Sequence, residues 1–274
     1  MLIRAYAKIN IGLDITGRRD DGYHEIDTIM QTINLYDEIE IERREDDEVI
    51  LTCSDPELSC GEDNLIMKAV RLLDGKGLDI HLTKNIPSQA GLGGGSSDAG
   101  AVLLALNRFL RLGYRVEELA AMSVKLGADV PYCVTGGTCR CRGIGEIITE
   151  LPFIRDCCVV IDKPEEGMNT REIFGRLDDI GLTKEDHPRM DEIEAAIYEG
   201  NLRKMCGQLG NVLEKPVNIL LPQIKEIKEK MYSFGALGAQ MSGSGSAVYG
   251  IFDNRQKAEE CAGSFDNGIL TEII

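Results

Sequence analysis

The start of the chain alternates between hydrophobic and polar side chains. Every second residue from Ile3 to Leu13 is hydrophobic, so residues 2–15 predict a strand with one buried face. A turn rich in glycine and aspartate follows in residues 17–25. The remaining segments that predict strands share this alternation, or are short apolar runs bounded by turn residues; they are 26–45, 49–54, 78–87, 138–152, 157–164, two arms within 236–254, and 268–274.

Other segments place hydrophobic residues at the three-to-four spacing of a helix. They are residues 61–77, 101–110, 114–127, 170–177, 191–198, 202–213, 222–235 and 255–265. After the helix that ends at Gly127, we expect a short loop through Asp129 and Pro131. A β-rich first half and an α/β second half indicate two domains, with the boundary near residue 150.

Residues 85–100, NIPSQAGLGGGSSDAG, lie between a predicted strand and a predicted helix and carry four glycines within five positions. Glycines let backbone N–H groups approach a ligand, and the start of the following helix favours an anion, most simply a phosphate. A Walker A loop is excluded because Ser96 stands where its lysine would be, and the dinucleotide fingerprint fails because its third glycine would fall on Ser96. The alternative is a flexible surface loop without a ligand.

Composition narrows the choice of partners. A net charge of −16 over 274 residues argues against nucleic acid and against an anionic membrane surface. No signal peptide opens the chain, and no apolar run approaches the ~18 residues of a membrane span. Nine cysteines without a CxxC pair, beside three histidines, indicate reduced structural thiols rather than zinc; Cys139-Arg-Cys141 comes nearest to a motif.

Three features could together form a phosphoryl-transfer site. Lys8 and Asn10 lie on the polar face of the first strand, Asp129 lies in a predicted loop, and the glycine stretch could hold phosphates. The chemistry needs backbone donors, a cation near the transferred group and an acid that orients the acceptor hydroxyl. The alternatives are a solvated strand face for Lys8 and an ordinary turn for Asp129.

A resemblance narrows these alternatives. AKINIGLDI (7–15), PSQAGLGGGSSDAG (87–100) and MSGSGSAVYG (241–250) resemble the three motifs of the GHMP kinases, which include galactokinase, homoserine kinase and the mevalonate kinases. Residues 22–41 and 127–152 resemble one branch closely, the kinases of 4-diphosphocytidyl-2-C-methyl-D-erythritol in the non-mevalonate isoprenoid pathway. The resemblance covers nearly the whole chain in the right order.

The resemblance implies an α+β protein with the two-domain GHMP kinase fold. A ribosomal-S5-like N-terminal domain would span residues 1–152 and a ferredoxin-like C-terminal domain residues 153–274. It also implies ATP with Mg²⁺, a small-molecule substrate, a monomer or homodimer, and a bacterial cytoplasmic enzyme, since no transit peptide is visible.

Residue roles follow from the same resemblance. Asp129 matches the catalytic aspartate and Lys8 the lysine that positions the acceptor hydroxyl. The positions that match the nucleotide side are Asn64, Lys84, Gly91, Leu92, Gly93, Gly94, Gly95, Ser96 and Ser97, with Ser96 or Ser97 as a possible magnesium ligand. The positions that match the substrate side are Asn10, Tyr23, His24, Thr170, Phe174, Gly243 and Ser244.

In that substrate set, Tyr23 and Phe174 would stack on a cytosine and His24 would read its edge. The segment 168–174 departs from the family pattern, because it lacks the usual Val-Ser before Thr170. Two alternatives remain: a related kinase of another small alcohol, and a catalytically silent sensor that binds a nucleotide.

Overall fold

The computed structural model describes residues 1–274, and the chain divides into two compact units. Unit 1 consists of Met1–Lys8, Leu35–Pro87 and Gly93–Gly136. Unit 2 consists of Ile9–Asn34, Ser88–Leu92 and Gly137–Ile274. The two long strands at the start of the chain, β1 (Leu2–Arg18) and β2 (His24–Arg43), contribute residues to both units.

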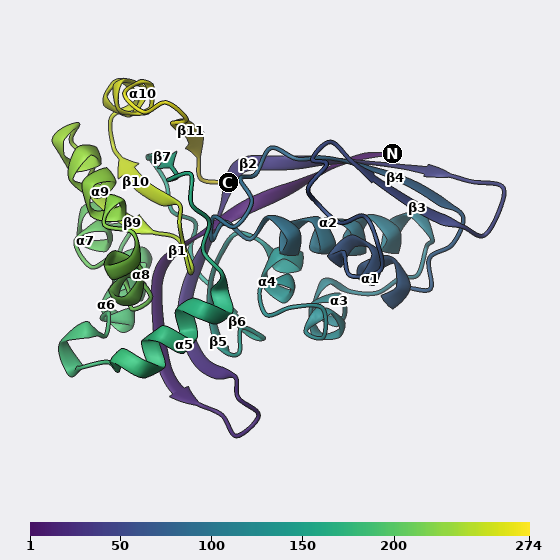
Figure 1. The fold of residues 1–274 in the computed structure, drawn as a ribbon, viewed down its shortest axis with the longest axis horizontal. Coiled ribbons are helices and arrows are strands. Elements are labelled where there is room, and N and C mark those ends of the chain that lie inside the picture. The colour runs from purple at the N-terminus through teal and green to yellow at the C-terminus, as the bar shows by residue number, and fades with distance from the viewer. The chain divides into compact units, whose positions relative to one another are not determined.

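Unit 1 is a sheet covered on one face by four helices (Figure 1). In the sheet, β4 (Leu78–Thr83) pairs antiparallel with β2 and parallel with β3 (Val49–Cys53). The helices are α1 (Leu65–Leu72), α2 (Gly94–Phe109), α3 (Val116–Ser123) and α4 (Val130–Thr135). Their apolar faces and the sheet form one core, because residues such as Ile80, Val70 and Leu103 are all fully buried in it.

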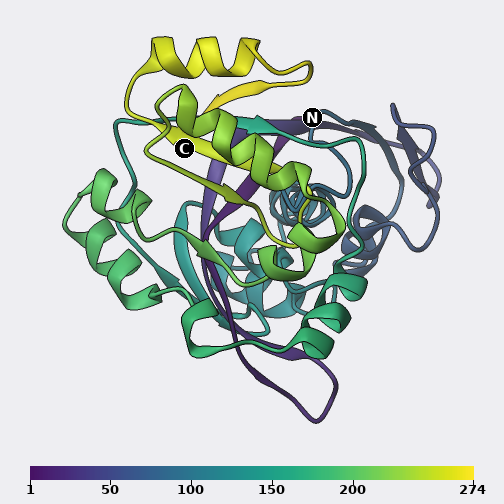
Figure 2. The same ribbon diagram turned by 60° about the vertical axis from the view of Figure 1, so that its left-hand side comes forward.

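Unit 2 contains a second, four-stranded antiparallel sheet in the order β11-β7-β10-β9. Its strands are β7 (Cys158–Asp162), β9 (Gly238–Met241), β10 (Val248–Phe252) and β11 (Ile269–Glu272). Helices α9 (Gln223–Ser233) and α10 (Arg255–Gly263) pack against this sheet, as Figure 2 shows. Phe252 and Met231 lie fully buried in the core between them.

The rest of unit 2 surrounds the parts of β1 and β2 that belong to it. Strand β5 (Thr138–Gly143) pairs with β2 and with β6 (Ile147–Glu150), and the short β8 (Gly210–Asn211) pairs with β1. The remaining helices are α5 (Thr170–Ile180), α6 (Met190–Tyr198), α7 (Leu202–Cys206), α8 (Glu214–Leu220) and the short 3-10 turn η1 (Lys184–Asp186).

The strand predicted at the start of the chain is present, but its expected solvent face is not exposed. All residues of β1 from 7 to 15 are buried, including Lys8 and Asn10 on the polar side. Helix α6 covers part of that side, since a Cβ at Gly12 would lie 2.8 Å from the Met190 sulfur. The solvated strand face considered for Lys8 is therefore excluded.

Three predicted helix boundaries were wrong. The helix expected to run to Gly127 ends at Ser123, and the loop expected around Pro131 is instead the start of α4, with proline in its first turn. The helix expected over 202–213 ends at Cys206, because the chain then forms the β8 pairing with β1. Helix α2 begins at Gly94, within the glycine stretch and earlier than its apolar run suggested.

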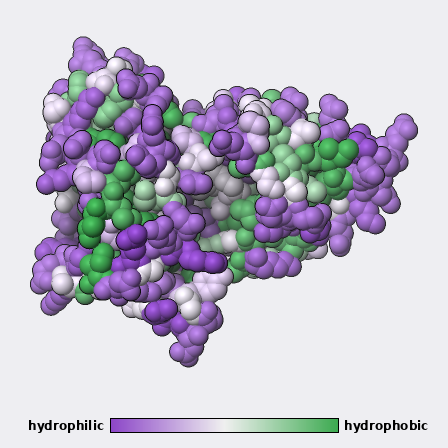
Figure 3. All heavy atoms as spheres, viewed as in Figure 1, coloured by the Kyte–Doolittle hydropathy of each residue, from purple (hydrophilic) through white to green (hydrophobic).

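The surface seen in Figure 3 is mostly hydrophilic, with smaller groups of hydrophobic residues among the polar ones. No helix of the structure is both long and apolar enough to span a membrane. Of the nine cysteines, four are buried and five are half-buried. Cys139 and Cys141 are fully buried in β5, and desolvation raises the pKa of the Cys139 thiol to about 12, as expected for an unreactive structural thiol.

Candidate active site

Lys8 and Asp129 form an ion pair in unit 1. The Nζ of Lys8 lies 3.4 Å from Oδ2 of Asp129. The lysine side chain is 4% exposed and the aspartate side chain 35% exposed, so the carboxylate is the accessible member of the pair. Asp129 immediately precedes α4, and the backbone of Cys133 donates to its carbonyl, which fixes the backbone from which the carboxylate projects. The structure thus brings together the two residues expected to act on the acceptor hydroxyl.

Gly93 packs directly against the Lys8 side chain. A Cβ at this glycine would lie 3.0 Å from Cγ and 3.1 Å from Cε of Lys8, closer than such contacts normally come. Gly93 also has a φ of 72°, in the left-handed region that favours glycine. The backbone of the glycine stretch can therefore reach the lysine only because no side chain is present at this position.

The first turn of α2 presents the donors expected for a phosphate site. Gly93 is the N-cap, and the backbone of Ser97 donates to its carbonyl, so the N–H groups of Gly94, Gly95 and Ser96 have no partner within the helix. Gly95 is exposed, Ser96 is half-buried, and Ser97 is 2% exposed with its Oγ 3.5 Å from the Cys133 sulfur. These groups and the helix dipole can bind an anion.

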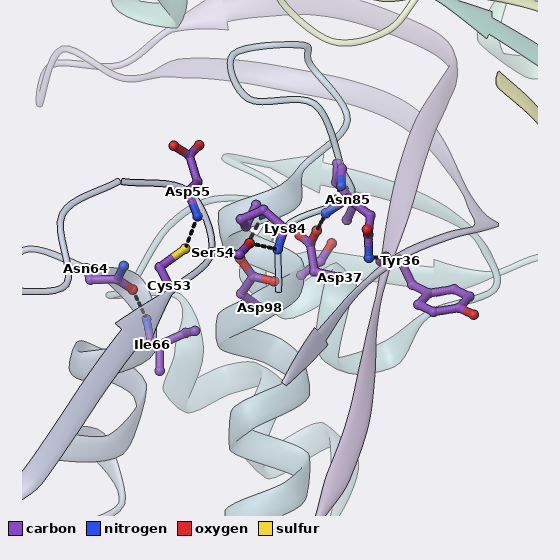
Figure 4. A network of polar contacts seen from close by, with 12 residues as sticks. Tyr36, Asp37, Cys53, Ser54, Asp55, Asn64, Ile66, Lys84, Asn85 and Asp98 are labelled. Atoms are coloured by element: carbon purple, nitrogen blue, oxygen red, sulfur yellow. Dashed lines mark hydrogen bonds and ion pairs between the residues drawn. The ribbon is translucent and has the colours of Figure 1, made fainter. Parts of the chain in front are cut away.

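Beside this turn, the ammonium group of Lys84 is held by two buried carboxylates (Figure 4). It forms ion pairs with Asp37 and, at 3.1 Å, with Asp98 of α2. The lysine was expected on the nucleotide side. Its Nζ would lie 3.2 Å from a Cβ at Gly94, so it does lie next to the glycine stretch, with two of its three donor positions already used.

Asp37 also anchors the segment that leads into the glycine stretch. Its Oδ1 accepts hydrogen bonds from the backbone N–H groups of Asn85, at 2.5 Å, and Ile86, at 2.8 Å, while Oδ2 pairs with Lys84. The residue is completely buried. A buried carboxylate needs such partners to offset the cost of its desolvation, and here two of them are backbone groups at the start of the glycine stretch.

Asp98 is the weakly satisfied member of this cluster. Its Oδ1 is buried without a hydrogen-bond partner. Burial raises the pKa of the Asp98 carboxyl to about 7; Lys84 opposes the rise and Asp37 adds to it. Because the folded protein binds this proton more tightly than an unfolded chain, the carboxyl's contribution to stability is greatest at low pH. That contribution falls from about pH 4, the ordinary value for aspartate, to about pH 7.

Asp98→Asn removes this titration. The pKa shift spans about three units, so we expect the stability of the variant, relative to the unchanged protein, to increase by about 3–4 kcal/mol between about pH 4 and pH 7 and to change little above that pH. Thermal unfolding of both proteins across this range measures the difference. Asp47→Asn, at an exposed position, is the control, and its difference should not vary in the same way. A pH-independent difference for Asp98→Asn would contradict the assignment.

Asn64, expected near the adenine, is the N-cap of α1. Its Oδ1 accepts from the backbone of Ile66 at 2.8 Å (Figure 4). Its Nδ2 donates to the carbonyl of Ser59 at 2.7 Å. The side chain therefore has a structural task in this fold. Its second amide hydrogen remains available for another acceptor.

Within the glycine stretch, residues 88–92 belong to unit 2 and lie along a second glycine turn, Gly243 to Gly245, and the residues that flank it. The backbone N–H groups of Ser246 and Ala247 donate to the carbonyls of Gln89 and Ala90, and Ser242 Oγ donates to the carbonyl of Gly91. Leu92 is buried. Residues 89–91 of the stretch expected to bind phosphate are therefore already hydrogen-bonded to other parts of unit 2.

The second glycine turn contains Gly243, which has a φ of 53°, and Ser244, which is 8% exposed. Asn211 on β8 supports the turn, because its Nδ2 donates to the carbonyls of Met241 and Gly243. Ser244 Oγ lies 2.8 Å from Oγ1 of Thr170, so these two expected substrate residues are in contact.

The other expected substrate residues of unit 2 fall into two places. Asn10 is 2% exposed, and its Nδ2 donates to Thr28 Oγ1 at 2.9 Å, while the Tyr249 hydroxyl donates to its carbonyl. His24 and Phe174 lie together, with their ring centroids 4.9 Å apart. Tyr23, next to His24 in the chain, is 59% exposed.

Sequence reasoning missed Asp37, Asp98, Asp178 and Asn211. Asp37 had a visible signal: it stands in the register of the apolar residues Ile39 and Ile41 on β2, where an acid needs a partner. The sequence carries no such signal for Asp178 or Asn211, because their hydrogen-bond partners lie on elements distant in the sequence.

Two family models match the chain. The model described as the GHMP kinases N terminal domain matches residues 64–137, and that of the GHMP kinases C terminal matches residues 188–267. The fold and these matches define a GHMP kinase, an enzyme that transfers a phosphoryl group from ATP to a small molecule.

Individual relatives narrow the family. The 4-diphosphocytidyl-2-C-methyl-D-erythritol kinase of Clostridium beijerinckii is 44% identical over 95% of this chain and 94% of its own. The kinase of the same name from Alkaliphilus metalliredigens is 42% identical over 94% of this chain and 89% of its own. A crystal structure of 4-(cytidine 5'-diphospho)-2C-methyl-D-erythritol kinase superposes with a TM-score of 0.82 and 31% identity, and covers 100% of this chain and 99% of that one. The chain belongs to the 4-diphosphocytidyl-2-C-methyl-D-erythritol kinase family of GHMP kinases.

These findings confirm the expected α+β fold with an N-terminal and a C-terminal GHMP kinase domain. The two matched ranges lie on either side of the expected boundary at residues 152 and 153. The boundary itself stays a prediction, as do the roles of the individual site residues.

Proposed function

We propose that this kinase phosphorylates the 2-hydroxyl of 4-diphosphocytidyl-2-C-methyl-D-erythritol in the bacterial cytoplasm, in non-mevalonate isoprenoid biosynthesis. The support is the identity of 42–44% to relatives with that name over nearly their whole length. The structural observation that carries the proposal is the ion pair between Lys8 and Asp129. A silent sensor would have no use for this pair, whereas transfer of a phosphoryl group to an alcohol uses an acid that orients the acceptor and a cation near the transferred group.

In the proposed reaction, Asp129 orients the acceptor hydroxyl and takes its proton. The oxygen of that hydroxyl then forms a bond to the γ-phosphorus of ATP, the bond to the β-γ bridging oxygen breaks, and ADP leaves. Lys8 positions the hydroxyl and offsets charge on the transferred group. The transition state of such transfers is loose, so a carboxylate that is a weak base can accept the proton late. Its 35% exposure leaves Asp129 accessible to a substrate.

The triphosphate would bind along the glycine stretch. In this proposal the backbone N–H groups of Gly94, Gly95 and Ser96 donate to phosphate oxygens. Asn64 and Lys84 would contact the nucleoside side with the donor positions that their structural partners leave free. Gly91 and Leu92 would complete the phosphate-binding stretch on its N-terminal side. Gly243 and Ser244 of the second glycine turn would contact phosphates and substrate.

The residues also fit a magnesium ion that arrives with ATP. Mg²⁺ prefers oxygen ligands, keeps several waters and is commonly held by one protein group beside substrate phosphates. No cluster of three or more histidine, cysteine or acidic side chains could hold a metal ion by itself. Ser96 is the better candidate ligand, because Ser97 is buried and its hydroxyl contacts Cys133. When bound, the ion would neutralise charge on the β- and γ-phosphates.

Tyr23, His24 and Phe174 would recognise the cytidine. A flat base can stack on aromatic rings, and a histidine can read its hydrogen-bonding edge. The ring contact between His24 and Phe174 supports this assignment, as does the exposure of Tyr23, an aromatic side chain that is not needed in the core. Thr170 would complete this substrate side through its contact with Ser244, and Asn10 would contact the substrate from β1.

The test is ADP release with ATP, magnesium and each of four acceptors: 4-diphosphocytidyl-2-C-methyl-D-erythritol, mevalonate, homoserine and galactose. We expect turnover with the cytidylyl substrate alone. Turnover only with another acceptor would replace the substrate but keep the kinase. Nucleotide binding without ADP release from any acceptor would favour the sensor.

A further inference from the structure

His24 is held by an acid that the proposed function does not use. Its Nε2 lies 2.7 Å from Oδ1 of Asp178, on the third turn of α5. The other carboxylate oxygen, Oδ2, lies 3.2 Å from a guanidinium nitrogen of Arg18. The histidine side chain is 11% exposed and Asp178 is 31% exposed. The ring therefore has a defined orientation before any substrate is present.

The carboxylate also decides which ring nitrogen carries the proton. An ionised carboxylate only accepts hydrogen bonds, so the nitrogen that faces it must carry hydrogen. Arg18 forms an ion pair with the second oxygen of this carboxylate. In a neutral imidazole the other nitrogen then has a lone pair and no hydrogen. Here that nitrogen is Nδ1, for which the structure shows no hydrogen-bond partner.

Phe174 packs against the imidazole ring of His24. Its ring centroid lies 4.9 Å from that of His24, with the two planes tilted by 41°. Phe174 and Asp178 are one helical turn apart on α5, so one helix supplies both the aromatic contact and the acid. The same helix thus fixes both the position and the tautomer of His24.

We propose that Asp178 is a positioning residue that makes the enzyme specific for cytosine, by holding His24 as an acceptor at Nδ1. This inference rests on the proposed function, in which His24 reads the base. Cytosine carries an amino group at its fourth ring position and uracil carries a carbonyl oxygen there. An acceptor at Nδ1 binds the amino group and repels the carbonyl oxygen. If uracil binds instead, the acceptor at Nδ1 is left without a hydrogen-bond donor, and a site that loses a hydrogen bond in this way discriminates strongly against the wrong base.

The first experiment observes the tautomer in the enzyme without ligand. Long-range ¹H–¹⁵N spectra of histidine-labelled protein distinguish protonated from unprotonated ring nitrogens, and the chain has only three histidines to assign. We expect His24 as the Nε2–H tautomer in the unchanged protein and a mixture of tautomers in Asp178→Asn. A His24 ring with its proton on Nδ1 in the unchanged protein would overturn the inference, whatever the substrate is.

The second experiment measures base discrimination. CDP and UDP are used as competitive inhibitors of ADP release with the cytidylyl substrate. For Asp178→Asn we expect KM for that substrate to rise about tenfold, kcat to stay within about twofold, and the preference for CDP over UDP to fall about tenfold. The matched control is Asp179→Asn, the next residue on α5, which is exposed and should change none of these values.

The outcomes separate the two proposals. An unchanged preference for CDP in Asp178→Asn would overturn the role of Asp178 and leave the proposed function intact. If CDP and UDP inhibit the protein without substitutions equally well, His24 does not distinguish the base, and this inference is overturned. A melting temperature for Asp178→Asn close to that of Asp179→Asn shows that any change in preference does not come from loss of folding.

Discussion

Asp129→Asn will lower kcat by about 10²–10⁴-fold, the usual cost of losing a general base. Asparagine has nearly the same shape and can still lie beside Lys8, but it cannot take the proton of the acceptor hydroxyl. KM for both substrates should change little, because the group acts on the proton in the transition state rather than in binding. Steady-state ADP release at saturating ATP and acceptor measures the effect.

The variant must be shown to fold. Asp129 has a side chain that is 35% exposed, so the substitution should shift the melting temperature only slightly. Asp47→Asn makes the same chemical change at an exposed position and should leave kcat unaltered. Nearly full turnover by Asp129→Asn would exclude the aspartate as the base and would leave Lys8 as the residue to examine next.

Gly91→Ala will destabilise unit 2 by about 3–5 kcal/mol, at the upper end of what single substitutions do. The new Cβ would overlap the carbonyl oxygen of Ser242 and lie 2.8 Å from its carbonyl carbon, and neither atom belongs to a flexible side chain. Gly91 also has a φ of 73°, which a residue with a side chain adopts only at a cost. The substitution must therefore push the glycine stretch away from the second glycine turn.

Gly95→Ala, four residues further along, is the control for stability. Its Cβ would meet only Leu65 Cδ1, at 3.6 Å, which is an ordinary contact, and alanine is the better helix former. Chemical denaturation of both variants compares the two sites. Equal stabilities would show that the backbone near Gly91 can move aside without cost, and that the contact with Ser242 is not a constraint.

The first strand shows which structural features hydrophobic periodicity can predict and which it cannot. Alternation predicted β1 and its buried face correctly, because that pattern is local. It could not predict that the polar face is buried as well, since this depends on α6, about 180 residues away in the sequence, which covers Gly12. The burial of Lys8 excludes the alternative of a solvated strand face, and the role of Lys8 in the reaction stays a prediction.

Short elements were missed for a different reason. The six residues of α4 are fewer than two helical turns, so they carry no periodicity to recognise. Asp-Val-Pro at positions 129–131 is equally compatible with a turn and with a helix that has proline in its first turn. Only packing against α2, where Gly100 leaves room for Cys133, decides between the two.

The carboxylate cluster around Lys84 needed the three-dimensional structure. Asp37 and Lys84 are 47 residues apart, and nothing in either local sequence indicates the other. The resemblance to GHMP kinases led to Lys84 as a nucleotide contact, and the structure adds two ion pairs that the resemblance did not include. Family motifs identify positions, whereas the energetic connections among them depend on burial and distance.

The hydrogen bonds that residues 88–92 form with the second glycine turn also bear on affinity for ATP. A loop that becomes ordered only when its ligand binds weakens binding by the conformational entropy that it loses. In this protein the first half of the segment is already ordered within its unit. That entropy is therefore lost when the chain folds, and binding of the nucleotide meets a preorganised backbone.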